Sequence, residues 1–203
     1  MRVWIKYIFV LSLTIAAVSA RPALAQAAQS APAPEKPLRT ELAIDYTYLR
    51  SNAPPGGCTC FNLNGGSGSI AWPVKQGGFA IAADLTIDNI GNINSTGYSL
   101  TLSTFTVGGR YLPRVGHSPL QPFGQVLVGA AHASGSLVKP PNPAAGSASL
   151  AFAANLGGGV DLRASRRFSV RLAEADYVPT TFGNGGNNHQ NNLRLSAGVV
   201  IHF

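Results

Sequence analysis

The stretch NNLRLSAGVVIHF, residues 191–203, decides the fold. Its side chains alternate between two faces almost without exception. One face carries Leu193, Leu195, Ala197, Val199, Ile201 and Phe203, and the other carries Asn192, Arg194, Ser196, Gly198, Val200 and His202. A period of two is typical of a β-strand with one apolar and one polar face. Because a soluble antiparallel sheet shows the same period, the rest of the chain must distinguish a soluble sheet from a membrane one.

The N-terminus indicates export from the cytoplasm. Arg2 and Lys6 form a short basic region, and residues 7–18 are an apolar stretch too short to span a bilayer as a helix. Ala23-Leu24-Ala25 then fits the pattern of small residues that a signal peptidase cleaves. We therefore predict a cleaved signal peptide at residues 1–25.

A flexible leader is predicted next, because residues 26–37 are rich in Ala, Pro and Gln. Cleavage after Ala20 is an alternative. Removing residues 1–25 lowers the formal net charge from +7 to +4. The charge therefore gives no support for nucleic-acid binding. Residues 38–203 are long enough for one domain.

Eight strand-like segments follow in that domain, separated by clusters of Gly, Asn, Pro and Ser. We predict strands at about 39–51, 67–75, 78–89, 97–112, 121–135, 147–163, 168–182 and 191–203. In residues 150–163, the face that carries charge also carries the small side chains. Inside a narrow closed barrel, small residues make room for a few long polar ones, while the outer face contacts lipid. The pattern predicts an all-β protein, an eight-stranded antiparallel up-and-down transmembrane β-barrel.

The connections alternate in length. Those around 52–66, 90–96, 136–146 and 183–190 are mostly long and rich in Gly, Asn and Pro, whereas those around 75–77, 113–120 and 164–167 are compact and carry positive charge. Bacterial outer-membrane barrels have short periplasmic turns and longer external loops. We therefore expect both ends of the domain to lie on the periplasmic side.

The signal peptide, the eight alternating strands and the terminal VVIHF of residues 199–203 together resemble the small outer-membrane β-barrels of the outer-membrane protein A transmembrane-domain type. More narrowly, residues 156–161 (LGGGVD), 174–177 (EADY) and 190–198 (QNNLRLSAG) resemble uncharacterised outer-membrane β-barrel-domain proteins of soil acidobacteria. The resemblance covers residues 38–203.

The resemblance implies an integral outer-membrane protein in contact with membrane lipid and lipopolysaccharide. It also implies delivery by periplasmic chaperones and insertion by the β-barrel assembly machinery, with Phe203 as the assembly signal. No single activity follows, because proteins with this fold include adhesins, small pores, anchors and lipid-modifying enzymes.

The charged face is expected to form the lumen. It carries the acids Glu41, Asp45, Asp84, Asp161, Glu174 and Asp176 and the bases Arg110, Arg163, Arg171 and Arg194. An eight-stranded barrel has an interior only wide enough for side chains to fill, and buried charges must be paired. We therefore predict a lumen that is plugged by a salt-bridge network.

Two strands break the alternation. In residues 168–176, strict alternation would point two carboxylates into lipid, so we predict a bulge near residues 172–174 that turns them inward. A similar phase change near residues 103–104 is predicted to place Leu100 and Leu102 on the outer face.

Candidate chemistry is sparse. His132 and Ser134 are two members of the Ser, His and carboxylate set that a lipid A hydrolase would use, but the sequence offers no third member beside them. Cys58 and Cys60 favour an oxidised pair in an exported chain, although a ring closed across one residue is strained. A loop staple, direct or through another molecule, is the first interpretation, and a redox or metal role is the alternative.

The sequence thus predicts a non-enzymatic outer-membrane barrel without a cofactor or a metal, whose surface loops serve envelope structure, adhesion or ligand contact. The alternatives are a narrow or gated pore and a lipid A-modifying hydrolase. The surface ligand is not identified by these residues.

Overall fold

The computed structural model describes residues 39–51, 60–74, 77–93, 97–113, 118–135, 150–183 and 188–203. The predicted signal peptide and leader, residues 1–37, lie outside these ranges. Within the described part of the chain, no helix is long and apolar enough to cross a membrane.

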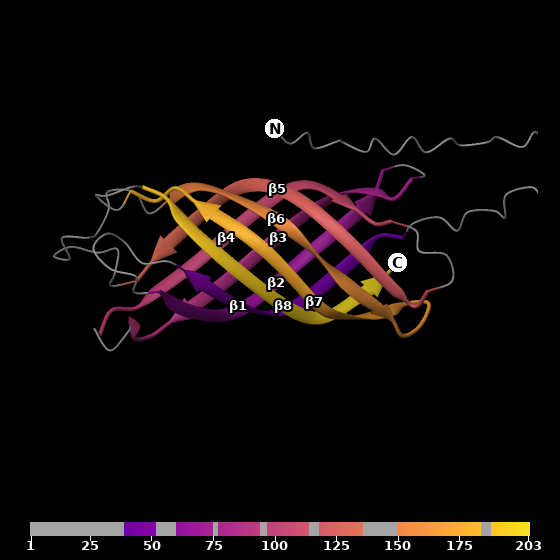
Figure 1. Cartoon of the computed structure of the whole chain (residues 1–203), viewed down its shortest axis with the longest axis horizontal. Helices are drawn as coiled ribbons and strands as arrows, with labels where there is room; N and C mark the ends of the chain where they lie inside the picture. The colour runs from indigo at the N-terminus through magenta and orange to yellow at the C-terminus, as the bar shows by residue number, and fades with distance from the viewer. Residues whose placement is uncertain are drawn as a thin grey trace, which may run out of the picture. The chain divides into compact units, whose positions relative to one another are not determined.

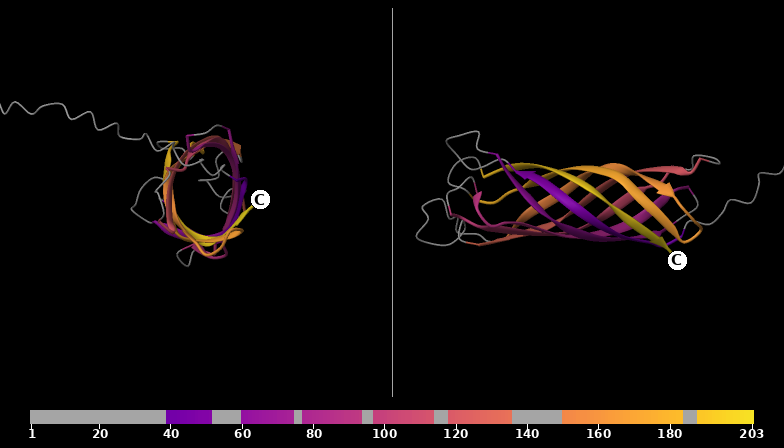
Figure 2. Two further views of the ribbon diagram at one scale, coloured as in Figure 1. Left: turned by 90° about the vertical axis from the view of Figure 1, so that its right-hand side faces the viewer. Right: turned by 90° about the horizontal axis from the view of Figure 1, so that it is seen from below.

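Eight antiparallel strands close into a barrel (Figures 1 and 2). They are β1 (Glu41–Ser51), β2 (Phe61–Pro73), β3 (Phe79–Ile90), β4 (Leu100–Tyr111), β5 (Leu120–Ser134), β6 (Leu150–Arg163), β7 (Phe168–Thr180) and β8 (Gln190–His202). Each strand pairs with the next in sequence, and β8 pairs with β1. Closure removes the sheet edges, so the strand backbones find their hydrogen-bond partners within the barrel. The predicted fold class is confirmed.

The two ends of the barrel differ. At one end, here called the turn end, residues 74–78, 112–119 and 164–167 connect the strands, and Phe203 N donates a hydrogen bond to the Thr40 carbonyl at 2.9 Å. At the other, the loop end, the connections are residues 52–60, 91–99, 135–149 and 181–189. In Figure 1 the C-terminus marks the turn end. The predicted alternation of connections is confirmed.

The start of β2 differs from the prediction, which assigned residues 61–66 to a loop because of their Asn and Gly content. The structure places these residues in the sheet, with Gly65 opposite Asp88. A Cβ atom on Gly65 would lie 1.9 Å from the Ile87 carbonyl oxygen and 2.8 Å from Asp88 Oδ1. Glycine is needed here because neighbouring chains approach closely, and not because the chain turns.

The outer face is apolar and has aromatic residues toward both ends. Large exposed apolar side chains cover the strands, among them Ile44, Ile81, Leu85, Phe105, Val126 and Leu195. Exposed aromatics toward the turn end are Trp72, Phe79, Tyr111, Phe168 and Phe203, and those toward the loop end include Tyr98, Phe152 and Tyr177. An apolar band between two aromatic girdles is typical of transmembrane barrels.

The predicted bulge in β7 is confirmed. The β7–β8 register shifts between Arg171 and Glu174, and the adjoining β6–β7 register shifts as well. Leu172 and Ala173 both point outward, so Glu174 and Asp176 are buried.

The predicted phase change in β4 is wrong. The β3–β4 and β4–β5 ladders are unbroken, and burial alternates regularly from Leu100 to Tyr111. Leu100 and Leu102 therefore point into the lumen. The prediction failed because it assumed that apolar side chains belong outside, whereas the lumen has an apolar region of its own.

Candidate functional site: the barrel lumen

Arg171 is the centre of the charged lumen. Its side chain is fully buried, and its Nη1 donates to Asp45 Oδ2 at 3.0 Å and to Glu174 Oε2 at 2.8 Å. Its Nε donates to Asp161 Oδ1 at 3.0 Å. One guanidinium thus contacts three carboxylates from three strands. Charge-assisted hydrogen bonds of this kind are the strongest that proteins form.

Arg194 forms a second centre on β8. Its Nη1 donates to Asp84 Oδ1 and its Nη2 donates to Asp176 Oδ2, both at 2.9 Å, and the Thr86 hydroxyl is a further partner. Asp84 lies on β3 and Asp176 on β7, so this group spans the lumen between strands that are not sheet neighbours.

Two uncharged side chains connect the charged groups. Gln125 Oε1 accepts from Arg110 Nη2 at 2.7 Å, and Gln125 Nε2 donates to Glu174 Oε1 at 2.6 Å. The Phe123 ring centroid lies 4.8 Å from the Arg110 guanidinium carbon and 4.6 Å from that of Arg171, within the range of cation–π attraction. Sequence reasoning missed both residues because it searched the inner face for charge only.

The glycines of β6 make room for these side chains. A Cβ atom on Gly157 would lie 2.3 Å from Asp176 Oδ1, and one on Gly159 would lie 2.9 Å from the Phe123 ring. The prediction that small residues on the charged face of residues 150–163 make room for long polar side chains is confirmed here.

An apolar layer fills the lumen at the loop end. It consists of the buried residues Leu49, Phe61, Leu63, Ile93, Leu100, Leu102, Ala131, Ala133 and Ala153, with Ile90 and Phe182 packed against them. The nine buried residues come from β1, β2, β4, β5, β6 and the connection after β3, whereas Ile90 ends β3 and Phe182 follows β7. The layer therefore fills the lumen near the loop end, beside Arg194, whose cross-strand neighbour is Leu49.

The lumen holds more acids than bases. All seven carboxylates in residues 39–203 are buried, namely Glu41, Asp45, Asp84, Asp88, Asp161, Glu174 and Asp176. The buried guanidiniums are those of Arg110, Arg171 and Arg194. Some buried polar atoms also have no hydrogen-bond partner, including both amide atoms of Asn155 and the hydroxyls of Thr106 and Ser196.

Arg163 does not join the network. It is exposed at the last position of β6, where the strand leaves the lumen. The sequence assigned it to the lumen by parity alone, but parity does not show where a strand passes the rim. The other nine predicted lumen residues are buried inside the barrel.

The remaining candidates lie away from the lumen. His132 is exposed and Ser134 half-buried on β5, on the outer face, whereas every carboxylate in the described residues of the barrel is buried. Cys60 lies half-buried before β2, and Cys58 lies outside the described residues, so their pairing stays a prediction. Phe203 is exposed at the turn end, and its role in assembly also stays a prediction.

Ser169, His202 and Glu41 form a buried group that sequence reasoning missed. Ser169 Oγ and His202 Nε2 lie 2.8 Å apart, and His202 Nδ1 lies 3.5 Å from Glu41 Oε1. The order of groups resembles a hydrolase triad. However, Ser169 has no exposed surface, so a substrate cannot reach its hydroxyl. The described residues also hold no cluster of three His, Cys, Asp or Glu side chains suited to a metal.

No family model and no curated protein matches the sequence, so the narrower resemblance to acidobacterial proteins stays a prediction. The structure is similar to the crystal structure of Neisserial surface protein A, with a TM-score of 0.59 and 18% identity over 81% of this chain and 97% of that one. It is also similar to Ail, the attachment invasion locus protein of Yersinia pestis, with a TM-score of 0.52 and 13% identity over 82% of this chain and 100% of that one.

The outer membrane enzyme PagL matches with a TM-score of 0.45 and 16% identity, over 78% of this chain and 99% of that one. The closed eight-stranded ladder, the apolar outer face and the first two likenesses agree with one another. The chain therefore has the fold of the small eight-stranded bacterial outer-membrane β-barrels.

Proposed function

We propose that this protein is a non-enzymatic integral outer-membrane barrel whose lumen is a closed scaffold and whose loops contact the surroundings of the cell. The observation that carries the proposal is the filling of the lumen. Arg171 and Arg194 cross-link carboxylates of β1, β3, β6 and β7 in its middle, and the apolar layer fills it near the loop end.

A filled lumen supports a scaffold because ions do not pass through packed side chains. Desolvated ion pairs hold the barrel together only while both partners remain in place. Loops on a rigid scaffold are the usual location of binding residues. The loop-end connections include the Pro-rich residues 139–143 and the Asn- and Gly-rich residues 184–189, which a barrel does not need in order to close.

The name of the attachment invasion locus protein associates one protein of this fold with attachment. At this level of identity the likeness concerns the fold, so adhesion enters here as part of the proposal. The proposed location is the outer membrane, with the loop end outside the cell and the turn end in the periplasm.

The test separates loops from lumen. Residues 52–58 and residues 184–188 are shortened in separate variants, and a lumen variant combines Asp176→Asn with Arg194→Gln, whose side chains interact at 2.9 Å. Heat-modifiable migration on gels confirms that each barrel is folded. We expect the loop variants to change surface adhesion or phage sensitivity and the lumen variant to leave them unchanged. The proposal would be refuted if the loop variants left adhesion and phage sensitivity unchanged and the lumen variant alone changed permeability.

A narrow pore is the second candidate, and two observations favour it. Among the described residues, the lumen has four more carboxylates than guanidiniums, and several of its buried polar atoms have no hydrogen-bond partner there. A pore with this lining would prefer cations to anions.

A lipid-modifying hydrolase has less support in the described residues. His132 and Ser134 face outward without a carboxylate beside them, and the buried Ser169 group has no access. Unaltered lipid A in cells that express the protein is the expected result.

A further inference from the structure

Arg50 lies on the outer face of the barrel without an internal counterion. It is the penultimate residue of β1, opposite Asn62 on β2 and Leu193 on β8, and its side chain is exposed. No hydrogen bond or ion pair to another described residue holds its guanidinium. Of the charged side chains in the described strands, it is the one exposed at the loop end.

The distribution of charge over the barrel explains this lack. Every carboxylate side chain in residues 39–203 is buried in the lumen. The exposed charges in the described residues are arginines, namely Arg39, Arg50, Arg163, Arg166 and Arg167. The exposed charged side chains of the described residues are therefore all cationic, and no described carboxylate side chain lies on the outer face to neutralise them.

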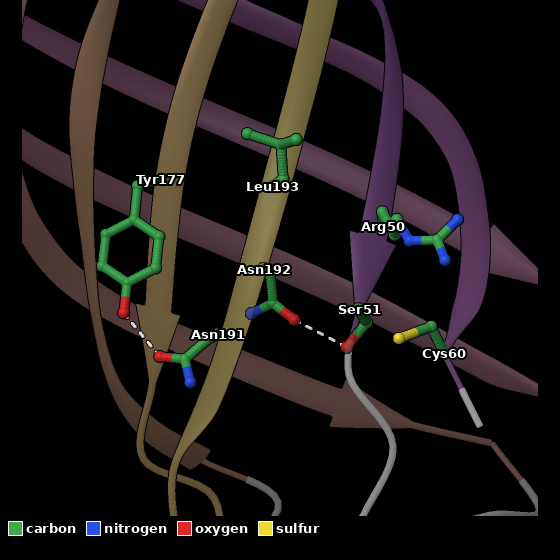
Figure 3. A pocket seen from close by; sticks show the side chains of 7 residues that line it. All are labelled: Arg50, Ser51, Cys60, Tyr177, Asn191, Asn192 and Leu193. Carbon is green, nitrogen blue, oxygen red and sulfur yellow. Dashed lines mark hydrogen bonds between the residues drawn. The ribbon is translucent and has the colours of Figure 1, made fainter. Parts of the chain in front are cut away.

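A pocket adjoins Arg50 (Figure 3). It has a volume of about 250 Å³ and lies at the loop-end termini of β7, β8, β1 and β2. Arg50 lies on one side of it and Tyr177 on the other, with Leu193 between them. Tyr177 and Leu193 are both exposed on the outer face, each with nearly half of its surface accessible.

Most of the accessible lining of the pocket is apolar, and its uncharged polar side chains are paired with one another; Ser51 and Asn192 are buried, whereas Asn191 is exposed. Ser51 Oγ donates to Asn192 Oδ1 at 2.6 Å, and the Tyr177 hydroxyl donates to Asn191 Oδ1 at 2.5 Å (Figure 3). Toward the middle of the barrel, the outer face continues on β8 as Leu195 and on β1 as Tyr48, which pairs with it, followed by the exposed Tyr46 and Ile44. The outer face of β8 is therefore apolar from Leu193 to Val199, and on β1 aromatic side chains separate the cationic Arg50 from the apolar Ile44.

We propose that this pocket binds the phosphate-bearing headgroup of a membrane lipid, with the phosphate on Arg50 and an acyl chain along Leu193 and Leu195. A guanidinium matches the geometry of phosphate oxygens and donates two hydrogen bonds to them at once. Basic pockets at the membrane interface bind lipid headgroups. The free-energy cost of placing an arginine on the lipid-facing surface is also small near the membrane–water interface. With the loop end outside the cell, as proposed above, the lipid is a phosphorylated glycolipid of the outer leaflet.

The test is a titration followed by NMR. Isotope-labelled folded barrel in phosphocholine micelles is titrated with diphosphorylated lipid A, and the Arg50 Nε–Hε and Leu193 methyl signals are followed. We expect saturable shifts and an affinity that falls about tenfold or more in Arg50→Gln, since charge-assisted contacts to phosphate are lost. The matched control is Arg163→Gln, which removes an exposed arginine at the turn end. Its affinity for lipid A should stay within about twofold of the wild-type affinity.

Two further ligands identify the source of the anion. Lipid A without phosphates should fail to shift the Arg50 signal, and inorganic phosphate should bind far more weakly than the lipid. Equal affinity of wild type and Arg50→Gln, equal binding of the dephosphorylated lipid, or phosphate binding as tightly as the lipid would each overturn the inference. Heat-modifiable migration confirms that both variants are folded. Fractionation of cells tests the outer-membrane location by itself, so its failure is distinct from a failure at this pocket.

Discussion

Arg171→Met is the perturbation that should weaken the barrel most. The substitution keeps a long flexible side chain in the lumen but removes the charge that Asp45, Asp161 and Glu174 share. Removing one partner of a buried ion pair costs about 3–5 kcal/mol, because the other charge is left without compensation. The loss of the guanidinium beside Phe123 adds a smaller cost. We expect the free energy of unfolding to fall by about 3–5 kcal/mol.

The assay is reversible denaturant unfolding of the barrel in lipid vesicles, followed by tryptophan fluorescence. The sequence contains Trp4 and Trp72, so removal of the predicted signal peptide leaves Trp72 as the reporter. Trp72 is exposed on the outer face of β2, where it reports contact with lipid. The matched control is Arg163→Met, which removes an exposed arginine and should change stability by about 0.5 kcal/mol or less.

A rescue experiment distinguishes uncompensated charge from lost packing. Adding Asp45→Asn and Asp161→Asn to Arg171→Met should recover stability, whereas the same two substitutions should destabilise the wild-type barrel. An Arg171→Met barrel within about 1 kcal/mol of wild type would refute the reasoning. A triple variant no more stable than Arg171→Met would also refute it.

Three further predictions concern packing, assembly and chemistry. Gly157→Ala should destabilise the barrel by about 1–3 kcal/mol, because its Cβ would lie 2.2 Å from the Ala175 carbonyl oxygen, while Gly68→Ala, with open space at that position, should not; equal unfolding midpoints would contradict this. Deleting Phe203 should lower the yield of heat-modifiable barrel without reducing export, and unchanged assembly would rule out its role as a signal. A fluorophosphonate probe should fail to label Ser169 in the folded protein, because its hydroxyl is inaccessible; labelling that Ser169→Ala abolishes would indicate an enzyme.

The sequence could predict the features that depend on local alternation. The period of two alone assigns Leu193 and Arg194 to opposite faces of the strand. The bulge in β7 could also be predicted, because strict alternation would place Glu174 and Asp176 in lipid. The strand content, the closure and the long and short ends follow from the same pattern.

Features that depend on the packing of the lumen could not be predicted in this way. Gly65 resembles a turn residue until the carbonyl of Ile87 is seen against it, and Leu102 resembles a lipid-facing residue until the apolar layer is known. The pairing of Arg171 with Asp45 depends on how the strands tilt around the barrel. Gln125 carries no charge, so its place between Arg110 and Glu174 has no signal in the sequence.

The central claim is that the lumen is closed, and single-channel recording in planar lipid bilayers tests it most directly. Purified, heat-modifiable wild-type barrel is inserted into the bilayer under an applied voltage. The filled lumen and the apolar layer predict a current no different from that of the protein-free bilayer. Repeated conductance steps of uniform size, carried by cations as the excess of buried carboxylates would favour, would contradict the account.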